Sequence, residues 1–265
     1  MMSKVAVRHI EIELEKLPAT ADGLRLLHLS DLHLRRWGRV EQETQRLLTS
    51  IDHDLLVITG DFCFRPQQHA RAAELTNRLL EPVSPKHGII AVLGNHDLPC
   101  FTAHETRLRF LRNSNMYVEL DSGGALCLAG VEQSHHRRGE AMTALEGTTS
   151  ELPRILLTHY PSTAFELPST SGVLVLAGHT HGGQIRIPGI GCVYNNDRIP
   201  VSMSRGLHLV NGNWLHVSAG IGASPPVPTR LFCPPEIGLI TLRTRVRRDA
   251  SWHREYSAGK VPVGV

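Results

Sequence analysis

The sequence predicts a layered α/β domain in which two β-sheets pack together and helices flank them. In the first half of the chain, short apolar runs alternate with segments of helical periodicity, which suits parallel strands joined through helices. In the second half, helical segments become rare while glycine and proline become frequent, which favours strands joined by turns. A two-sheet sandwich flanked by helices accommodates both halves.

The first half of the chain supplies the helices. Strands are expected where apolar residues alternate with polar ones or run without interruption, at residues 5–14, 24–29, 55–59, 88–93, 117–120 and 125–130. Helices are expected where apolar residues recur with helical spacing, at residues 40–51, 67–80 and 104–112. The last two of these strands are expected to pair around the turn at residues 121–124.

The second half of the chain supplies six further short strands. They are expected at residues 154–158, 172–177, 184–187, 207–210, 214–217 and 237–243. A polar stretch, residues 132–152, separates them from the first half. Because neither a linker-like segment nor an internal repeat divides the chain, we predict a single domain over residues 1–265.

The composition narrows the class of protein. The 265 residues carry a formal net charge of only +3, and 20% of them are charged, so neither a disordered polyelectrolyte nor a strongly basic nucleic-acid binder is expected. Histidine is abundant, with 16 residues against 3 tryptophans, 4 tyrosines and 6 phenylalanines. Imidazole is the commonest transition-metal ligand, but histidine is also an ordinary polar surface residue. The positions of the histidines along the chain decide between these interpretations.

The cysteines and the chain ends bear on the compartment. The five cysteines are widely spaced and form no C-x-x-C pair, which argues against a disulfide framework and a thiolate zinc site. The first residues contain no apolar signal-peptide core, and the longest apolar runs are about strand length. We therefore expect a soluble, reduced, cytoplasmic protein. Four arginines in residues 243–248 favour a solvated edge strand and tail, and peripheral contact with the acidic inner face of the cell membrane is the alternative.

Polar side chains follow five of the expected strands at the points where the strands end. Each apolar run stops, and an Asp, Asn or His follows at once, usually beside a glycine. The carboxyl ends of strands are where α/β sheets build their sites. These strand ends supply Asp31, His33, Asp61, Asn95, His96, His159, His179 and His181. Gly-Asn-His-Asp and Gly-His-Thr-His-Gly-Gly are rare strings, and five such ends in order indicate a functional site.

These side chains form a ligand set of carboxylate and amide oxygens and imidazole nitrogens without a thiolate. Such a set is typical of sites that bind Mn²⁺, Fe, Zn²⁺ or Co²⁺, whereas a structural zinc site would favour cysteine. On an extended chain Asp31 and His33 point to the same side, as do His179 and His181. The number of candidate ligands exceeds what one metal ion with open coordination positions requires. A carboxylate can bridge two cations about 3.5–4 Å apart. The sequence therefore favours a two-metal centre.

With these motifs, the sequence resembles the calcineurin-like metallophosphoesterase superfamily. The segments LSDLHL, VITGDF, VLGNHD, LLTHYP, LAGHTHGGQIRIP and RLFCPPEIGLITL are similar to the bacterial branch that holds peripheral membrane phosphodiesterases and a UDP-2,3-diacylglucosamine pyrophosphatase. The resemblance covers residues 24–242, which would be the domain core, and leaves the basic tail 243–265 outside. It implies a four-layer α/β/β/α sandwich, in which two mixed sheets are flanked by helices and a dinuclear metal site lies at one edge.

The resemblance also implies a role for each motif residue. The first metal ion would be held by Asp31, His33, Asp61 and His181. The second would be held by Asp61, Asn95, His159 and His179, with Asp61 bridging. His96 would face the phosphate and stabilise the transition state or protonate the leaving oxygen, and Asp97 would orient His96. A metal-bridging hydroxide would attack phosphorus. Mn²⁺ is the first choice of metal, and Fe, Zn²⁺, Co²⁺ and Mg²⁺ are the alternatives.

The implied reaction is hydrolysis of a phosphodiester or pyrophosphate bond in a lipid-linked or nucleotide substrate such as UDP-2,3-diacylglucosamine. One alternative is an inactive scaffold with this fold, which the complete motif set disfavours. Another is a phosphomonoesterase or protein phosphatase, although Gly60-Asp61 continues as Phe62-Cys63-Phe64-Arg65 rather than as the Val-Asp-Arg-Gly of protein phosphatases. The motifs leave the oligomeric state and the physiological substrate open.

Four further groups of residues lie outside these motif positions. Relatives often carry Gly-(Val/Ile)-Asp-Asp where this chain has Gly130-Val131-Glu132. The basic run at residues 135–138 is expected to be a solvated loop, with recognition of a second phosphate or a nucleotide as the alternative. His28 is expected to be a hydrogen-bonded strand residue rather than a ligand. An apolar groove for an acyl chain, or ordinary loop packing, is expected of Phe62, Phe64, Cys192, Val193, Tyr194, Met203, Pro225, Pro226 and Val227.

Overall fold

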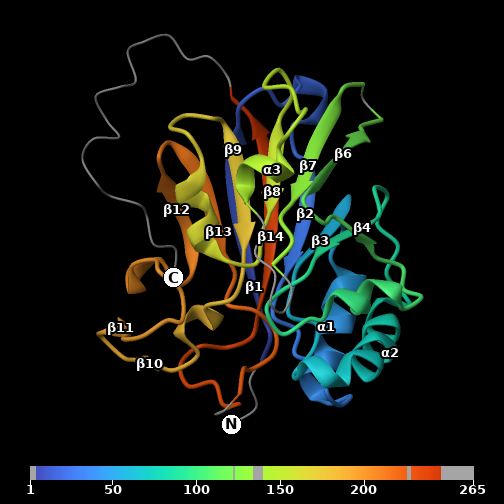
Figure 1. The fold of residues 1–265 in the computed structure, drawn as a ribbon, viewed down its shortest axis with the longest axis vertical. Helices are drawn as coiled ribbons and strands as arrows, with labels where there is room; N and C mark the ends of the chain where they lie inside the picture. Colours follow the sequence, from blue (N-terminus) through green and yellow to red (C-terminus); the bar gives the residue numbers. More distant parts are fainter. Residues whose placement is uncertain (1–3, 122, 134–139, 226–227, 246–265) are drawn as a thin grey trace.

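Two six-stranded sheets face each other in the computed structural model, which describes residues 4–121, 123–133, 140–225 and 228–245 (Figure 1). The first sheet has the order β1 (Ala6–Leu14), β14 (Glu236–Thr244), β2 (Arg25–Leu29), β3 (Leu55–Thr59), β4 (Ile89–Val92) and β5 (Arg109–Phe110). The second has the order β12 (Gly206–Val210), β13 (Asn213–Val217), β9 (Val173–Ala177), β8 (Arg154–Leu157), β7 (Ala125–Gly130) and β6 (Ser114–Glu119). Both sheets are mixed, with a parallel centre in each.

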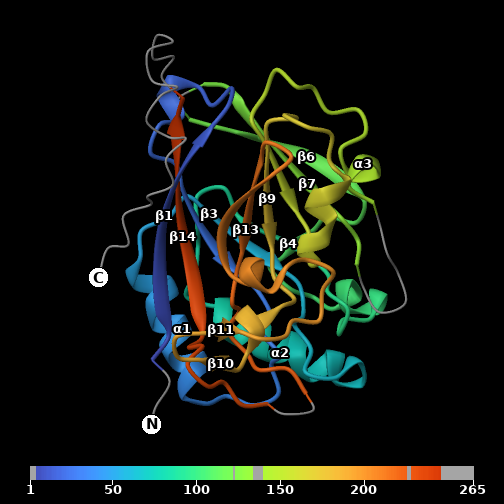
Figure 2. The same cartoon turned by 90° about the vertical axis from the view of Figure 1, so that its left-hand side faces the viewer.

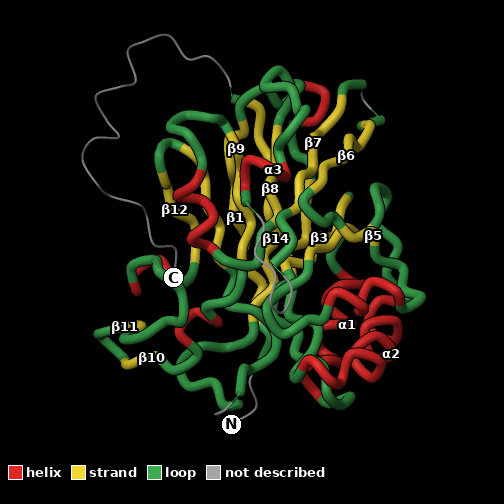
Figure 3. The backbone as a smooth tube through the Cα atoms, viewed as in Figure 1, coloured by secondary structure: helices red, strands yellow, loops and turns green. Residues whose placement is uncertain are grey.

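Helices cover the outer faces of the sheets, and Figure 3 shows the longer ones grouped on one side. The two long helices are α1 (Arg39–Ser50) and α2 (His69–Leu80), which pack on the first sheet. The second sheet is covered by α3 (Ala141–Ala144) and the 3₁₀ helix Pro161–Glu166. Further 3₁₀ helices span Ala19–Ala21, Pro66–Gln68, Pro99–Ala103, His181–Gly183 and Val201–Met203. The order of layers is therefore α/β/β/α, as the resemblance implies.

Three apolar clusters correspond to the three interfaces between the four layers. The central cluster joins the inner faces of the two sheets, with Val57 and Ile90 packed toward Leu157 and Leu176. On the outer face of the first sheet, Leu48 of α1 and Leu75 of α2 are buried. Each fully buried side chain of this size stabilises the fold by about 1.5–3 kcal/mol. Successive residues of the buried strands belong to different clusters: in β3, Leu55 and Val57 belong to the central cluster, and Leu56 and Ile58 to the outer one.

Most of the predicted strands and helices form, and the two largest departures concern residues 104–112 and 184–187. No helix forms at residues 104–112: the segment ends in β5, which pairs parallel with β4 and extends the first sheet. Phe110 packs against Phe62 and Phe101 there, so an aromatic cluster fixes this segment rather than helical periodicity. The strand expected at 184–187 shortens to β10 (Arg186–Ile187), which pairs with β11 (Gly191–Cys192) outside both sheets.

The parallel centres of the two sheets bring five loops to one end of the sandwich. Strands β2, β3 and β4 run in the same direction in the first sheet, and β8 and β9 do so in the second. Their carboxyl ends carry the predicted ligand loops, and Figure 2 shows both sheets edge-on with these loops on the side of β10 and β11.

Within the described residues, none of the helices has the length and apolarity that crossing a membrane requires.

Candidate metal centre

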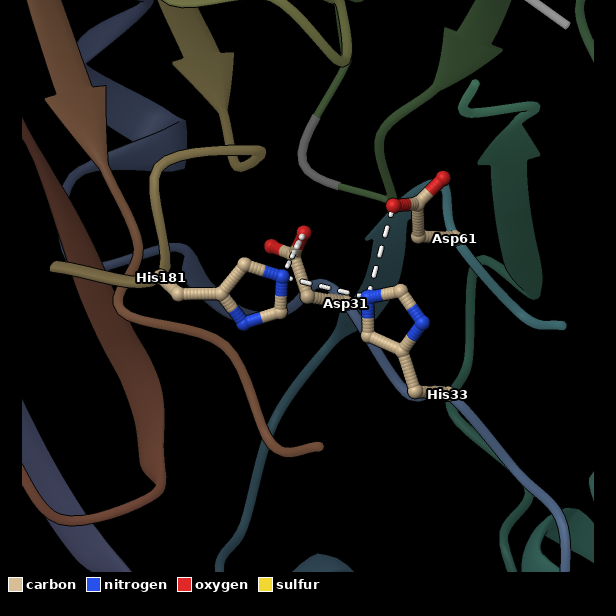
Figure 4. A group of neighbouring side chains, drawn as sticks. All are labelled: Asp31, His33, Asp61 and His181. Atoms are coloured by element: carbon tan, nitrogen blue, oxygen red, sulfur yellow. Dashed lines mark hydrogen bonds and ion pairs between the residues drawn. The ribbon is translucent and has the colours of Figure 1, made fainter. Parts of the chain in front are cut away.

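Four side chains from three loops point toward one another at this end of the sandwich (Figure 4). Asp31 and His33 follow β2, Asp61 follows β3, and His181 follows β9. All four are buried, and one ligand atom from each lies within 4.8 Å of the others. His33 Nε2 lies 3.1 Å from His181 Nε2 and 3.4 Å from Asp61 Oδ2. His181 Nε2 lies 3.4 Å from Asp31 Oδ1. We call this group the first focus.

A second group of ligand atoms lies on the other side of the Asp61 carboxylate. His159 Nε2 lies 3.4 Å from the same Asp61 Oδ2 that faces His33. It also lies 3.2 Å from His179 Nδ1 and 3.0 Å from Asn95 Oδ1. These residues follow β8, β9 and β4 and form what we call the second focus. The two foci share one carboxylate oxygen, which is the arrangement that a bridging ligand requires.

The outer nitrogens of three of these imidazoles are hydrogen-bonded to backbone carbonyl groups. His33 Nδ1 lies 3.0 Å from the Cys63 carbonyl oxygen, and His159 Nδ1 lies 2.8 Å from that of Thr59. His179 Nε2 lies 3.2 Å from the carbonyl oxygen of Asn196. An imidazole that donates its outer N–H directs the lone pair of the other nitrogen into the site, as metal-ligating histidines do. This donor set fits divalent cations.

Left-handed backbone brings the ligands together, which differs from the extended geometry expected for Asp31 and His33. The φ angles of Asp31, His33, Asp61, His179 and His181 are 51°, 42°, 56°, 68° and 51°. Non-glycine residues rarely adopt this region, and such conformations concentrate at functional sites. Gly94 and Gly178 allow the loops to approach, because a Cβ on Gly94 would overlap Asp61, and one on Gly178 would overlap Ser30 and Asp31.

Burial and charge set the protonation of the ligands. Burial lowers the pKa of His33 to about 4 and that of His179 to about 3. Both imidazoles are therefore uncharged at neutral pH, and each has a nitrogen lone pair available for a metal ion. Although burial alone would lower the pKa of His159, the Asp61 carboxylate raises it to about 10. The same interaction holds the pKa of Asp61 well below its usual range against the effect of burial. A cation bound by His159 would therefore compete with a proton, and its affinity would rise with pH.

His96 lies beside the first focus, with its ring centroid 4.8 Å from that of His33. Its backbone N–H donates to Asp61 Oδ1 over 2.8 Å, and its Nδ1 lies 3.1 Å from the Phe64 carbonyl oxygen. The Asp97 carboxylate, to which the resemblance assigns the orientation of His96, accepts from the backbone N–H groups of Cys63 and Gly94. The Phe64 carbonyl group therefore sets the direction of the His96 ring, and Asp97 joins the loops after β3 and β4.

Gln133 is a residue of the site that the motifs do not reveal. Its buried carboxamide oxygen accepts from the backbone N–H groups of His159 and Tyr160, over 2.7 and 2.8 Å, and from the Thr158 hydroxyl. It thereby holds the backbone that carries the second-focus ligand His159. The preceding Glu132 pairs with Arg112 at 2.8 Å. Thus the segment that departs from the family pattern holds the backbone of the loop that carries His159.

Arg230 is a second residue that sequence reasoning missed. Its guanidinium lies 3.2 Å from His181 Nδ1, and it donates to the carbonyl oxygen of Ala219 over 2.7 Å. This half-buried cation takes the place of the carbonyl partner that the other three histidines have. Burial, together with His33 and Arg230, lowers the pKa of His181 well below its usual value.

The residues considered for an apolar groove divide into core and surface. Phe62 is fully buried and stacks on Phe101 at 4.9 Å, and Cys192 is also buried. Val193 and Tyr194 are exposed, at 56% and 72%. Pro226 and Val227 lie outside the described residues, as do His135, His136, Arg137 and Arg138. Phe62 therefore packs in the core and lines no groove.

The fold and the buried ligand cluster define a class of hydrolase. A family model described as calcineurin-like phosphoesterase matches residues 24–183, which is more than half of the chain. The chain therefore belongs to the calcineurin-like phosphoesterase family, and it is a metal-dependent phosphoester hydrolase.

Individual relatives agree with this family. The chain is 30% identical to an uncharacterized metallophosphoesterase of Aquifex aeolicus, over 89% of this chain and 91% of that protein. It is 26% identical to the phosphodiesterase YaeI of Escherichia coli, over 84% and 83% of the two chains. It is also 26% identical to the UDP-2,3-diacylglucosamine pyrophosphatase LpxG of Chlamydia muridarum, over 87% of each.

Proposed function

We propose that this protein hydrolyses a phosphodiester or pyrophosphate bond with two divalent metal ions, one at each focus. The observation that carries the proposal is the position of Asp61 Oδ2, which lies 3.4 Å from both His33 Nε2 and His159 Nε2. Asp31 and His181 complete the first focus, and Asn95 and His179 complete the second. When bound, the ions supply a nucleophilic hydroxide at neutral pH and neutralise charge on the phosphoryl oxygens.

The chain's own residues orient the substrate and move protons. His96 donates its Nδ1–H to the Phe64 carbonyl group, so Nε2 is the nitrogen that would face the phosphoryl group. From there it would stabilise the developing charge or protonate the leaving oxygen. Asp97 contributes indirectly, because its hydrogen bonds to Gly94 and Cys63 fix the loops that carry Asn95 and the carbonyl partner of His33.

The oxygen and nitrogen ligands are compatible with Mn²⁺, which we propose as the native ion, and Fe, Zn²⁺, Co²⁺ and Mg²⁺ are the alternatives to be compared. We further propose a lipid-linked nucleotide substrate of the type of UDP-2,3-diacylglucosamine. The similarity to the Chlamydia muridarum pyrophosphatase supports this substrate class, and the similarity to the Escherichia coli phosphodiesterase supports diester cleavage. Such a substrate would place the protein on the inner face of the cell membrane.

The proposal is tested by hydrolysis assays of the metal-depleted protein after addition of each ion. We expect turnover of bis(p-nitrophenyl) phosphate to be restored by Mn²⁺ and to exceed turnover of p-nitrophenyl phosphate. Absence of turnover with every ion would leave only the scaffold interpretation, and a preference for the monoester would indicate a phosphomonoesterase. A second screen compares UDP-2,3-diacylglucosamine, simple nucleotide diesters and phospholipids, with release of uridine monophosphate as the readout for the first.

A further inference from the structure

Exposed apolar side chains gather on one part of the molecule. Among the described residues, twelve large apolar side chains are exposed, and eight of these belong to residues 185–201 and 231–232. Ile190 and Tyr194 are 71% and 72% exposed, and Phe232 is 64% exposed. We call this group the hairpin surface. It consists of Ile185, Ile187, Ile190, Val193, Tyr194, Val201, Leu231 and Phe232.

Backbone hydrogen bonds hold the segments of the hairpin surface together. Strands β10 and β11 pair antiparallel, so Ile187 lies opposite Gly191. The segment 231–232 lies beside β10, because the Arg186 N–H donates to the Leu231 carbonyl over 2.9 Å and the Leu231 N–H donates to Gln184 over 3.1 Å. Figures 1 and 2 show this ribbon at the end of the sandwich, outside both sheets. The apolar side chains therefore belong to one continuous protruding structure.

The same structure is attached to the metal centre. The carbonyl group of Asn196 is the partner of His179 Nε2, at 3.2 Å. Arg230, next to Leu231, contacts His181 Nδ1 at 3.2 Å. Both histidines thus have their outer nitrogens fixed by loops whose outer side chains are exposed and apolar. Whatever covers the hairpin surface therefore lies next to loops that contact the metal centre.

The charges on the hairpin surface are mostly positive. Arg186, Arg198 and Arg205 lie in residues 184–205, where Asp197 is the only acidic residue. Asp197 accepts from backbone N–H groups, including that of Arg198. None of the three arginines forms an ion pair with another described residue. Apolar and aromatic tips with basic residues around them are typical of surfaces that lie in the headgroup region of anionic bilayers.

We propose that the hairpin surface docks on an anionic lipid bilayer and holds the metal centre at the membrane surface. Ile190, Tyr194 and Phe232 enter the boundary between headgroups and acyl chains, while Arg198 contacts lipid phosphates. The inference deepens the proposed function, because its consequence for a lipid-linked substrate rests on that function. Docking itself requires no hydrolysis, so the two proposals can fail separately.

The test is flotation of the full chain with vesicles of phosphatidylcholine alone or with added phosphatidylglycerol, with Mn²⁺ and again after EDTA. We expect binding to the anionic vesicles in both cases. Ile190→Asp/Phe232→Asp should weaken binding more than tenfold, because two apolar anchors are lost. Arg198→Gln should weaken it about fivefold, since one basic group contributes about 1 kcal/mol near an anionic surface. Leu209→Asp is the matched control: Leu209 is 61% exposed on β12 and should leave binding unchanged.

Hydrolysis of bis(p-nitrophenyl) phosphate by each variant separates docking from catalysis. The surface variants should keep wild-type turnover of this soluble substrate while they lose vesicle binding. Three results would overturn the proposal. These are a wild-type chain that does not float, an Ile190→Asp/Phe232→Asp variant that floats like the wild type, and a concentration-dependent dimer that the same double substitution disrupts. The last result would assign the hairpin surface to a second copy of the chain.

Discussion

Among the residues that the structure describes, the buried histidines form two groups that differ in what faces them. Four of them, at the metal centre, direct nitrogen atoms toward carboxylates or toward each other, and three of these donate their outer N–H to carbonyl groups. The other two, His28 and His216, lie between the sheets, with their Nδ1 atoms 3.0 Å apart. His28 Nε2 contacts the Thr59 hydroxyl at 2.9 Å, and neither histidine of this pair has a carboxylate partner.

Burial alone therefore does not identify a metal ligand. Burial lowers the pKa of His28 well below its usual value, and it lowers that of His216 to about 4, as it does at the metal centre. What distinguishes the centre is a shared carboxylate oxygen with an imidazole nitrogen on each side of it. The two groups are nevertheless neighbours, because the hydroxyl of Thr59 faces His28 while its carbonyl group faces His159.

Asp61→Ala should have the largest effect. Its carboxylate faces both foci, so we expect loss of both ions and a fall in kcat of about 10⁴-fold or more, because metal-ion catalysis supplies several kcal/mol. The measurements are metal content by mass spectrometry and turnover of bis(p-nitrophenyl) phosphate. Asp52→Ala is the control, since Asp52 is 92% exposed and pairs with Arg25. Full metal occupancy in Asp61→Ala would refute the bridging assignment.

His96→Ala should separate metal binding from proton transfer. His96 contacts the centre through its backbone N–H and its ring edge, so we expect both ions to remain while kcat falls about 10²- to 10³-fold. The pair of measurements is metal content and the pH profile of kcat. His69→Ala, which alters a histidine paired with His104 outside the centre, should leave both unchanged. A near-normal kcat in His96→Ala would remove this residue from the mechanism.

The sequence predicts which side chains gather at this end of the sandwich, because each lies in a short motif at a strand end. It also predicts the two sheets with flanking helices, because the apolar pattern that distinguishes a strand from a helix lies within each segment. The prediction of a helix at 104–112 is wrong because Phe110 packs against Phe62 and Phe101. The periodicity of the segment carries no information about these contacts with other segments. The side chains that hold the site residues in place are not predicted for the same reason. Gln133, for example, contacts the backbone of His159, which lies 26 positions away. Side chains that support the site from distant segments carry no motif.

Gln133→Ala tests whether such support matters. The substitution leaves the buried N–H groups of His159 and Tyr160 without their partner, which costs about 1–3 kcal/mol of folding free energy for each group. Because the loop then holds His159 less firmly, we expect metal affinity to fall about 10- to 100-fold. Gln45→Ala is the control, since the Gln45 carboxamide joins α1 to carbonyl groups of α2. Unchanged metal affinity, measured by calorimetric titration, would limit Gln133 to a structural role.

His216→Leu should leave turnover unchanged and act only on stability, because His216 lies in the pair without carboxylates. The pKa of its imidazole is 6.5 in the unfolded chain and about 4 in the folded protein, where burial lowers it. As the pH falls from 6.5 to 4, the unfolded chain takes up the proton first, so the wild type loses about 3 kcal/mol of stability through this group. Urea unfolding of the metal-free protein at both pH values should therefore show a smaller pH dependence for His216→Leu. If the pH dependence were unchanged while kcat fell, the interior pair would be part of the catalytic centre and the distinction between the two groups would not hold.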